Sequence, residues 1–229
     1  MIRTCFIASL WAGLLSLDIT GFGPIMISQP MIAGPLFGWL YGHVAIGMIV
    51  GGIVQLMWMD VTPVGVGIPY DAMSVTLLAV FWASLPTYTG LSQTSQMVLA
   101  LMMAVPLGAL FRRMDQRSRR LNTLIVHKIE SVSDDHLAWA LNFGVLAGLA
   151  WCFIRYAVTY FVAMLCGAWL WRKIGYFTPM DSALTMAAIL LPIAGMGVTL
   201  DLFLSEEPDA RWLARLGFKT TNRRMKDRA

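Results

Sequence analysis

Charge is what this chain of 229 residues has least of. Only 13% of its residues are charged and 58% are hydrophobic, whereas about 25% of the residues of a soluble domain are charged. The charged residues between positions 2 and 111 are Arg3, Asp18, Asp60 and Asp71. No soluble core needs so long an apolar stretch. The composition therefore argues against a soluble enzyme or binding domain and predicts an integral membrane protein.

Cysteine and histidine are also scarce, with three of each. The cysteines lie in apolar segments without metal-ligand spacing or a disulfide framework, which is typical of small packing residues; they are Cys5, Cys152 and Cys166. No histidine is paired with a cysteine, glutamate or serine at a catalytic spacing; the histidines are His43, His127 and His136. Because the sequence also lacks a phosphate-binding loop, we expect no enzyme activity, metal site or cofactor on this chain.

What the chain has in abundance is apolar segments, separated by glycine, proline and polar residues. They cover residues 4–19, 31–41, 44–59, 72–85, 96–111, 139–171 and 182–203. An apolar helix of about 20 residues spans a bilayer, so the short segments before residue 72 predict tilted helices or a bent hairpin. The pattern predicts an all-α integral membrane protein, a polytopic helical bundle with broken or re-entrant segments near residues 20–30 and 60–71.

Positive charge is concentrated in two places after residue 111. Six basic residues lie between positions 112 and 128, and seven lie between 211 and 228. By the positive-inside rule both clusters are cytoplasmic, and the two apolar segments between them supply the even number of crossings that this requires. We therefore expect a membrane-embedded domain over residues 1–204 with a cytoplasmic loop at about 112–137, followed by a basic cytoplasmic tail over 205–229.

The loop at 112–137 carries apolar residues at three-to-four spacing, namely Leu121, Leu124, Ile125, Ile129 and Val132. That spacing is typical of an amphipathic helix. Its basic flank favours a helix that lies on the cytoplasmic face of the membrane, and a docking or hinge element is the alternative. The basic tail follows a transmembrane domain, so we attribute its charge to topology and anionic membrane lipid, not to nucleic-acid binding.

The most informative segment is GGIVQLMWMDVTPVGVGIPYDA, at residues 51–72. An apolar run ends there in prolines, glycines and aspartates, between segments of membrane character. Lipid cannot hydrogen-bond a broken backbone, so such a break is tolerated only inside protein or beside a water-filled cavity. Transporters build substrate sites at interruptions of this kind. The segment therefore predicts a site for a polar solute near residues 55–71.

The same segment carries a family resemblance. Its motifs are Gly51-Gly52-x-x-Gln55-Leu56-x-Trp58-Met59, Pro63-Val64-Gly65 and Pro69-Tyr70-Asp71-Ala72. Similar family steps occur at Gln29-Pro30-Met31-Ile32, Val126-His127-Lys128, Leu146-Ala147-Gly148-Leu149 and Phe153-Ile154-Arg155. Over about residues 20–200 the chain resembles the IIC subunit of the mannose/fructose/sorbose-type sugar phosphotransferase system.

The resemblance implies that sugar passage and phosphate transfer are carried out by different subunits. IIC and a second membrane subunit, IID, form the sugar pathway in the bacterial cytoplasmic (inner) membrane. The soluble subunits IIA and IIB carry phosphate, and IIB phosphorylates the sugar as it is released inside. The implied function is a sugar-translocating subunit of a hetero-oligomer for the mannose, fructose and sorbose class of sugars, with no phosphoryl transfer on IIC itself.

Four departures from the family pattern leave a second hypothesis open. Gln29 replaces an arginine, Gln55 a glutamate, Asp60 a glycine and Tyr70 a proline. Family members also usually continue with a further apolar segment, whereas this chain turns polar at Ser205. We expect a divergent, C-terminally short member. The alternative to transport is a membrane scaffold or sensor derived from the same fold.

The substrate-binding candidates are Gln29, Gln55, Asp60 and Asp71. Asp71 matches the family aspartate, and an ionisable residue in a membrane segment is a functional candidate by default; it would also cap the helix that starts at Ala72. Gln55 can donate to and accept from sugar hydroxyls, or it can simply pack. Asp60 is either a ligand or, as we favour, the solvated end of a helix.

The remaining predictions concern structural roles. We expect four residues of the break to shape its loop without touching substrate by side chain, namely Pro63, Gly65, Gly67 and Pro69. Arg155 lies in the middle of the apolar run 139–171, where an unpaired charge is costly. Its role is therefore predicted to be a structural ion pair. The partners considered are Asp18, Asp60, Asp71 and Asp201.

Overall fold

The computed structural model describes residues 2–18, 26–59, 71–86, 91–130, 137–173 and 180–206, with side chains described up to residue 200 except at 119–138 and 140. The described residues form α-helices and no β-strand. The helices are α1 (Ile2–Ser16), α2 (Pro30–Leu40), α3 (Val44–Met57), α4 (Ala72–Ala83), α5 (Gln93–Glu130), α6 (Leu137–Trp171) and α7 (Asp181–Glu206). The predicted all-α membrane bundle is confirmed.

The helices fall into two length classes. Three of them contain stretches long and apolar enough to cross a membrane, at Gln93–Ser118, Leu141–Trp171 and Asp181–Leu200. The first four have only 11 to 15 residues, and at about 1.5 Å per residue they are shorter than a hydrocarbon core of about 30 Å. The short N-terminal segments expected from the sequence are thus present as short helices.

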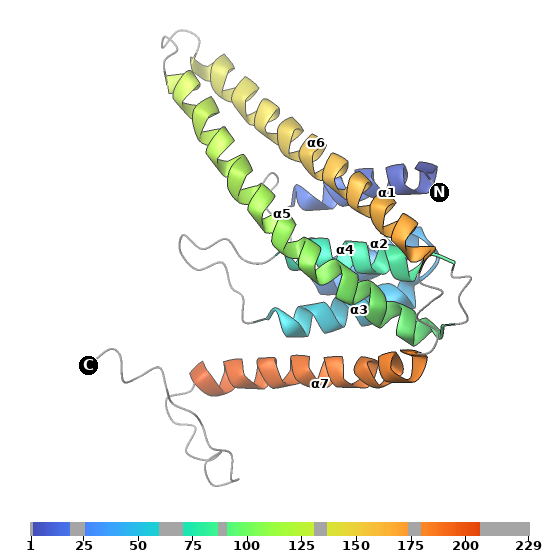
Figure 1. Ribbon diagram of the computed structural model, residues 1–229. Coiled ribbons are helices and arrows are strands. Elements are labelled where there is room, and N and C mark those ends of the chain that lie inside the picture. Colours follow the sequence, from blue (N-terminus) through green and yellow to red (C-terminus); the bar gives the residue numbers. More distant parts are fainter. Residues whose placement is uncertain are drawn as a thin grey trace.

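Helix α4 is the centre of the bundle (Figure 1). Every residue from Met73 to Ala83 is buried, and α4 contacts α1, α2, α3, α5 and α6. A helix that is apolar on all sides lies either inside a protein core or in lipid, and α4 is enclosed by other helices. The first residue before α4 is Asp71, so the start of this helix places that carboxyl group beside the core.

Helices α2 and α3 pack through glycines. A Cβ atom at Gly34 would collide with the carbonyl oxygen of Gly47, and one at Gly51 would collide with the carbonyl oxygen of Pro30. Because lipid gives no hydrophobic drive for helix association, close backbone approach through small residues is a principal way in which membrane helices attract one another. The glycines therefore hold α2 and α3 together as a tight hairpin.

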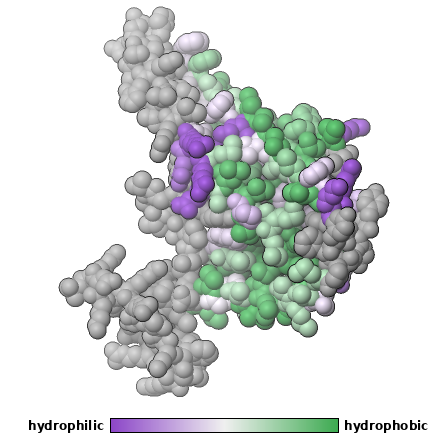
Figure 2. Space-filling view, viewed as in Figure 1, coloured by the Kyte–Doolittle hydropathy of each residue, from purple (hydrophilic) through white to green (hydrophobic). Residues whose placement is uncertain are grey.

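The outer surface is apolar between two polar edges. Figure 2 shows hydrophilic side chains at two opposite edges of the molecule and a mostly hydrophobic surface between them. Helix α7 runs from one edge toward the other (Figure 1), and only 11% of its stretch Asp181–Leu200 is buried. This arrangement is typical of a surface that faces lipid.

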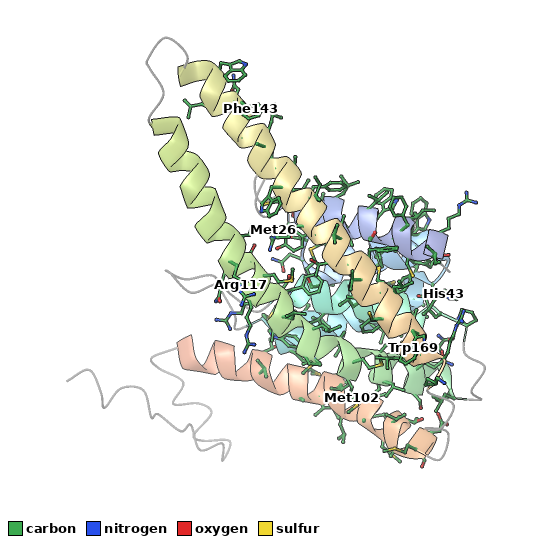
Figure 3. The ribbon with its side chains drawn as sticks, turned by 45° about the horizontal axis from the view of Figure 1, so that its top comes forward. Met26, His43, Met102, Arg117, Phe143 and Trp169 are labelled. Carbon is green, nitrogen blue, oxygen red and sulfur yellow. The ribbon has the colours of Figure 1, made fainter. Side chains whose placement is uncertain are left out.

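Labelled residues identify the two ends of the bundle (Figure 3). His43, in the turn between α2 and α3, and Trp169, near the end of α6, lie at one end, whereas Arg117 of α5 lies at the other. Arg112 and Arg113 are exposed, as Arg117 is. The last turns of α7 lie on the same side as Arg117 (Figures 1 and 3).

The structure differs from the sequence prediction in the loop at 112–137. Residues 112–130 are not a separate surface helix; they continue α5 without interruption from Gln93 to Glu130. The far half of α5 and the first half of α6 form a hairpin that projects beyond the bundle (Figure 1). Trp139 and Phe143 lie near its tip on α6, are 70% and 60% exposed, and stack with ring centroids 5.4 Å apart.

Both predicted breaks coincide with gaps between helices. Helix α1 ends at Ser16 and α2 begins at Pro30, and α3 ends at Met57 while α4 begins at Ala72. Asp18, which is buried, accepts a hydrogen bond from the backbone N–H of Ser28 at 3.0 Å and so ties together the two sides of the first break. Residues 19–25 and 60–70 lie outside the described residues.

Candidate functional site

The start of α4 is built around Asp71. One of its carboxylate oxygens accepts the backbone N–H of Ser74 at 2.9 Å, and the other accepts the Ser74 hydroxyl at 2.6 Å. This is an N-cap, in which a side chain satisfies a backbone donor left free at a helix start. Asp71 therefore caps α4, which is one of the two roles that the sequence predicted for it. Each oxygen retains acceptor capacity, so capping leaves room for a further hydrogen bond.

A tyrosine from another helix completes the cap. The hydroxyl groups of Ser74 and Tyr160 lie 2.7 Å apart, and both residues are fully buried. Polar side chains of α4 and α6 thus meet inside an otherwise apolar core.

The Tyr160 ring is held in place by other aromatic rings. Its centroid lies 4.8 Å from that of Phe111 and 6.2 Å from that of Tyr156. These contacts leave the ring little freedom to move, so the position of its hydroxyl is determined by packing on α5 and α6.

A buried ion pair involves Arg155, five residues before Tyr160 on α6. A guanidinium nitrogen of Arg155 lies 3.1 Å from a carboxylate oxygen of Asp115, and the two side chains are only 10% and 15% exposed. The Tyr156 hydroxyl donates to the same carboxylate at 3.4 Å, and its ring lies 4.3 Å from the guanidinium carbon. Arg155 therefore has a carboxylate partner inside the bundle, as expected.

The identity of that partner was predicted wrongly. The partner is Asp115, which was not among the four aspartates considered. The neighbour of this part of α6 is α5, whose continuation past Phe111 brings Asp115 alongside. Asp115 lies among the arginines of the basic cluster, and for that reason it was not considered as a partner from the sequence. Tyr156 donates to Asp115 and stacks on Tyr160, whose hydroxyl hydrogen-bonds with Ser74, so the ion pair and the cap belong to one polar region.

The other predicted site residues make no hydrogen bond to Asp71 that the structure describes. Gln55 lies in the last turn of α3, and its amide oxygen is buried without a hydrogen-bond partner among the described residues. The end of α3 and the start of α4 lie on the same side of the bundle (Figure 1). Gln29 precedes α2, is exposed, and makes no capping hydrogen bond through its side chain. Asp60 and residues 63–69 lie outside the described residues.

Sequence reasoning missed Ser74, Tyr156, Tyr160 and Asp115. A signal for Ser74 is its position three residues after a capping aspartate, where a helix start presents its free N–H groups. A signal for the two tyrosines is their place one residue and five residues after the buried Arg155, because a tyrosine hydroxyl buried in an apolar helix usually has a partner. Asp115 gave no local signal.

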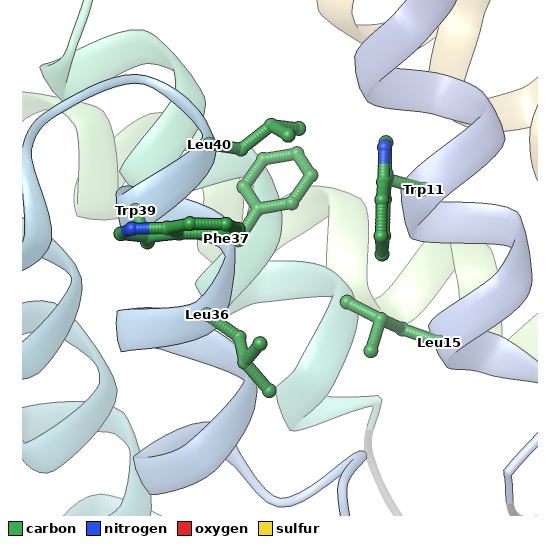
Figure 4. A pocket seen from close by; sticks show the side chains of 6 residues that line it. All are labelled: Trp11, Leu15, Leu36, Phe37, Trp39 and Leu40. Atoms are coloured by element: carbon green, nitrogen blue, oxygen red, sulfur yellow. The ribbon is translucent and has the colours of Figure 1, made fainter.

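An apolar groove lies between α1 and α2 (Figure 4). It is lined by aromatic and aliphatic side chains, namely Trp11, Leu15, Leu36, Phe37, Trp39 and Leu40. Such a lining offers no set of acceptors and donors for a sugar, so the groove is a poor candidate for the polar-solute site. No cluster of metal-ligating side chains occurs in the described part of the chain either.

Comparisons with known proteins agree with the fold. A family model for the sorbose-specific IIC component of the phosphotransferase system matches residues 2–221. A solved structure described only as a membrane protein has a TM-score of 0.70 and 17% identity, covering 95% of this chain and 84% of the other. No curated protein sequence matches.

A second solved structure is the mannose transporter ManYZ in complex with microcin E492, determined by cryo-electron microscopy. It has a TM-score of 0.58 and 17% identity, and the match covers 95% of this chain and 84% of that one. At this identity the two solved structures show only a shared fold. The family match, which covers nearly the whole chain, shows membership of the family. The chain belongs to the family of sorbose-specific IIC components of the sugar phosphotransferase system.

Proposed function

We propose that this chain is the sugar-translocating IIC subunit of a mannose-family phosphotransferase system in the bacterial inner membrane. It acts with a IID membrane subunit and receives no phosphate itself, because the soluble IIA and IIB subunits carry the phosphoryl group. The observation that carries the proposal is a carboxylate, Asp71, held by hydrogen bonds at the start of the buried central helix, directly after the interrupted segment.

The chemistry of that position suits a sugar. A sugar hydroxyl donates well to an ionised carboxylate, and such charge-assisted hydrogen bonds are shorter and stronger than neutral ones. An apolar surrounding strengthens them further, because bulk water does not compete. Gln55, whose amide oxygen has no partner among the described residues, is the natural second ligand from the other side of the interruption.

The decisive experiment is uptake in cells that lack their own mannose-class transporters. Expression of this chain with cognate IID, IIA and IIB should give accumulation of phosphorylated sugar, and omission of IID should abolish it. Gln55→Glu, which restores the family residue, should keep the membrane level and increase uptake. If no sugar of the mannose, fructose and sorbose class accumulates with all partners present, transport is not the function.

A membrane scaffold or sensor is the second candidate function. It is favoured by the departures at Gln55 and Tyr70, which lie in the segment that would contact the sugar. A scaffold would co-purify with the same partner subunits but would neither bind nor accumulate sugar. Co-purification without sugar binding is therefore the result that selects it.

We further propose that the basic end of α5 and the C-terminal tail face the cytoplasm. The exposed Arg117 lies on the side where α7 ends, and the exposed Arg112 and Arg113 precede it on α5. Basic residues remain on the cytoplasmic side of membrane proteins. In a background without native cysteines, Gln116→Cys and Thr221→Cys should resist an impermeant thiol reagent added outside intact cells. Gln116 is exposed, which makes it a suitable probe position. Labelling of either cysteine from outside would reverse the orientation.

A further inference from the structure

The hydrogen bonds around Asp71 form a chain that begins on another helix. From Tyr160 of α6 the chain passes through the Ser74 hydroxyl to one carboxylate oxygen of Asp71, with donor–acceptor distances of 2.7 and 2.6 Å. All of the oxygen atoms belong to residues that lie at or beside the core. The three residues therefore connect the Asp71 carboxylate at the start of α4 to α6.

The direction of these hydrogen bonds follows from counting protons. The Ser74 hydroxyl has one proton, and it is donated to Asp71. The Ser74 oxygen can then only accept from Tyr160, so the tyrosine hydroxyl is the donor. Each bond in such a chain polarises the next, and both stabilise the charged form of the carboxylate at its end.

We propose that Tyr160 is a positioning residue for the sugar site, acting on the Asp71 carboxylate through Ser74. The aromatic rings of Phe111 and Tyr156 fix the Tyr160 hydroxyl, the hydroxyl fixes the rotamer of Ser74, and Ser74 holds one oxygen of Asp71. These hydrogen bonds favour the ionised form of the carboxylate and orient it, with its remaining acceptor capacity free for a sugar hydroxyl. The identity of the ligand rests on the proposed function, but the positioning itself does not.

Two substitutions interrupt the chain at different points: Tyr160→Phe removes the first hydrogen bond, and Ser74→Ala removes both. Tyr160→Phe deletes only the hydroxyl and keeps the ring packing. Ser74→Ala deletes the hydroxyl but keeps the backbone N–H that caps the helix. Tyr41→Phe is a matched control, because the Tyr41 hydroxyl is also buried but has no hydrogen-bond partner among the described residues.

The first readout needs no sugar. An apolar carbodiimide modifies carboxyl groups in their protonated form, and digestion with mass spectrometry measures the rate at each aspartate. Tyr160→Phe and Ser74→Ala should each label Asp71 severalfold faster than the wild type, and the double variant should behave like Ser74→Ala alone. Asp18, which is held by Ser28, should label at the same rate in every variant, and Tyr41→Phe should leave Asp71 unchanged.

The second readout is the affinity for a mannose-class sugar in the complex with its partner subunits. Tyr160→Phe should weaken binding about three- to tenfold, the range expected for the loss of one hydrogen bond in a charged network. In an Asp71→Asn background the same substitution should have no further effect, whereas a residue that merely supports the fold would weaken binding in both backgrounds.

The two readouts separate the two hypotheses. Equal labelling of Asp71 in all variants, including no labelling at all, would overturn the positioning role of Tyr160, and so would a loss of affinity that persists in Asp71→Asn. Faster labelling in Tyr160→Phe together with no sugar binding by the wild type would keep the positioning role and reject the proposed function.

Discussion

Helices α4 and α7 are both strongly apolar, but they occupy opposite environments. Every residue of α4 from Met73 to Ala83 is buried, whereas only 11% of the apolar stretch of α7 is. Apolar character does not distinguish a buried helix from one that faces lipid, because lipid tails are as apolar as leucine. The distinguishing feature is the buried polar side chain: Ser74 and Thr76 of α4 have no exposed surface, and each makes a hydrogen bond.

The largest expected difference between the two helices is in leucine-to-alanine substitutions. Leu77 of α4 has no exposed surface, whereas Leu190 of α7 is 63% exposed. Leu77→Ala should leave a cavity and lower the free energy of unfolding by about 2–5 kcal/mol. Leu190→Ala removes a side chain that has few protein neighbours to lose, so its effect should be under about 1 kcal/mol. Thermal unfolding of the purified chain in detergent measures both, and equal losses would contradict the comparison.

The buried ion pair extends the comparison to charge. Asp115→Asn leaves the Arg155 guanidinium without its carboxylate in an apolar bundle, where an uncompensated arginine costs about 2.5–3.5 kcal/mol on insertion scales. Removal of both charges, with Arg155→Gln added to Asp115→Asn, should restore part of the lost stability because no unpaired charge remains. The membrane level and melting temperature of the three variants test this. A double variant that is less stable than either single variant would exclude a structural ion pair.

A smaller effect is expected where α2 and α3 approach through glycine. Gly51→Ala would drive a Cβ atom into the carbonyl oxygen of Pro30, and backbone cannot move aside as a flexible side chain can. The expected loss is about 1–3 kcal/mol, typical of overpacking. Its neighbour Gly52 has nothing within 4 Å of a Cβ atom, so Gly52→Ala should be neutral. Similar melting temperatures for the two variants would show that α2 and α3 do not pack closely.

The sequence predicts most helix positions because apolar runs end at glycine and proline clusters. Segments 44–59, 72–85 and 139–171 correspond to α3, α4 and α6 within two residues at each end. The continuation of α5 to Glu130 could not be predicted from the change to basic residues, because a change in composition does not break a helix. No glycine or proline lies between positions 109 and 130, and that absence is the better guide.

The candidate site was predictable only in part. The interruption and its family motif identify Asp71, and the preference of aspartate for helix starts predicts its capping role. Tyr160 lies 86 residues from Ser74 in sequence, and Arg155 lies 40 residues from Asp115. Such pairs depend on which helices pack against one another, and a uniformly apolar sequence carries no information about that choice.

The most direct test of the account is the sugar affinity of Asp71→Asn in the complex with the partner membrane subunit. Asparagine caps a helix about as well as aspartate, so the melting temperature without sugar should stay at the wild-type value. The charge-assisted hydrogen bond to the sugar contributes about 1.5–3 kcal/mol, so the affinity should fall on the order of tenfold to a hundredfold. Wild-type affinity in Asp71→Asn would show that Asp71 is only a cap and that the sugar binds elsewhere.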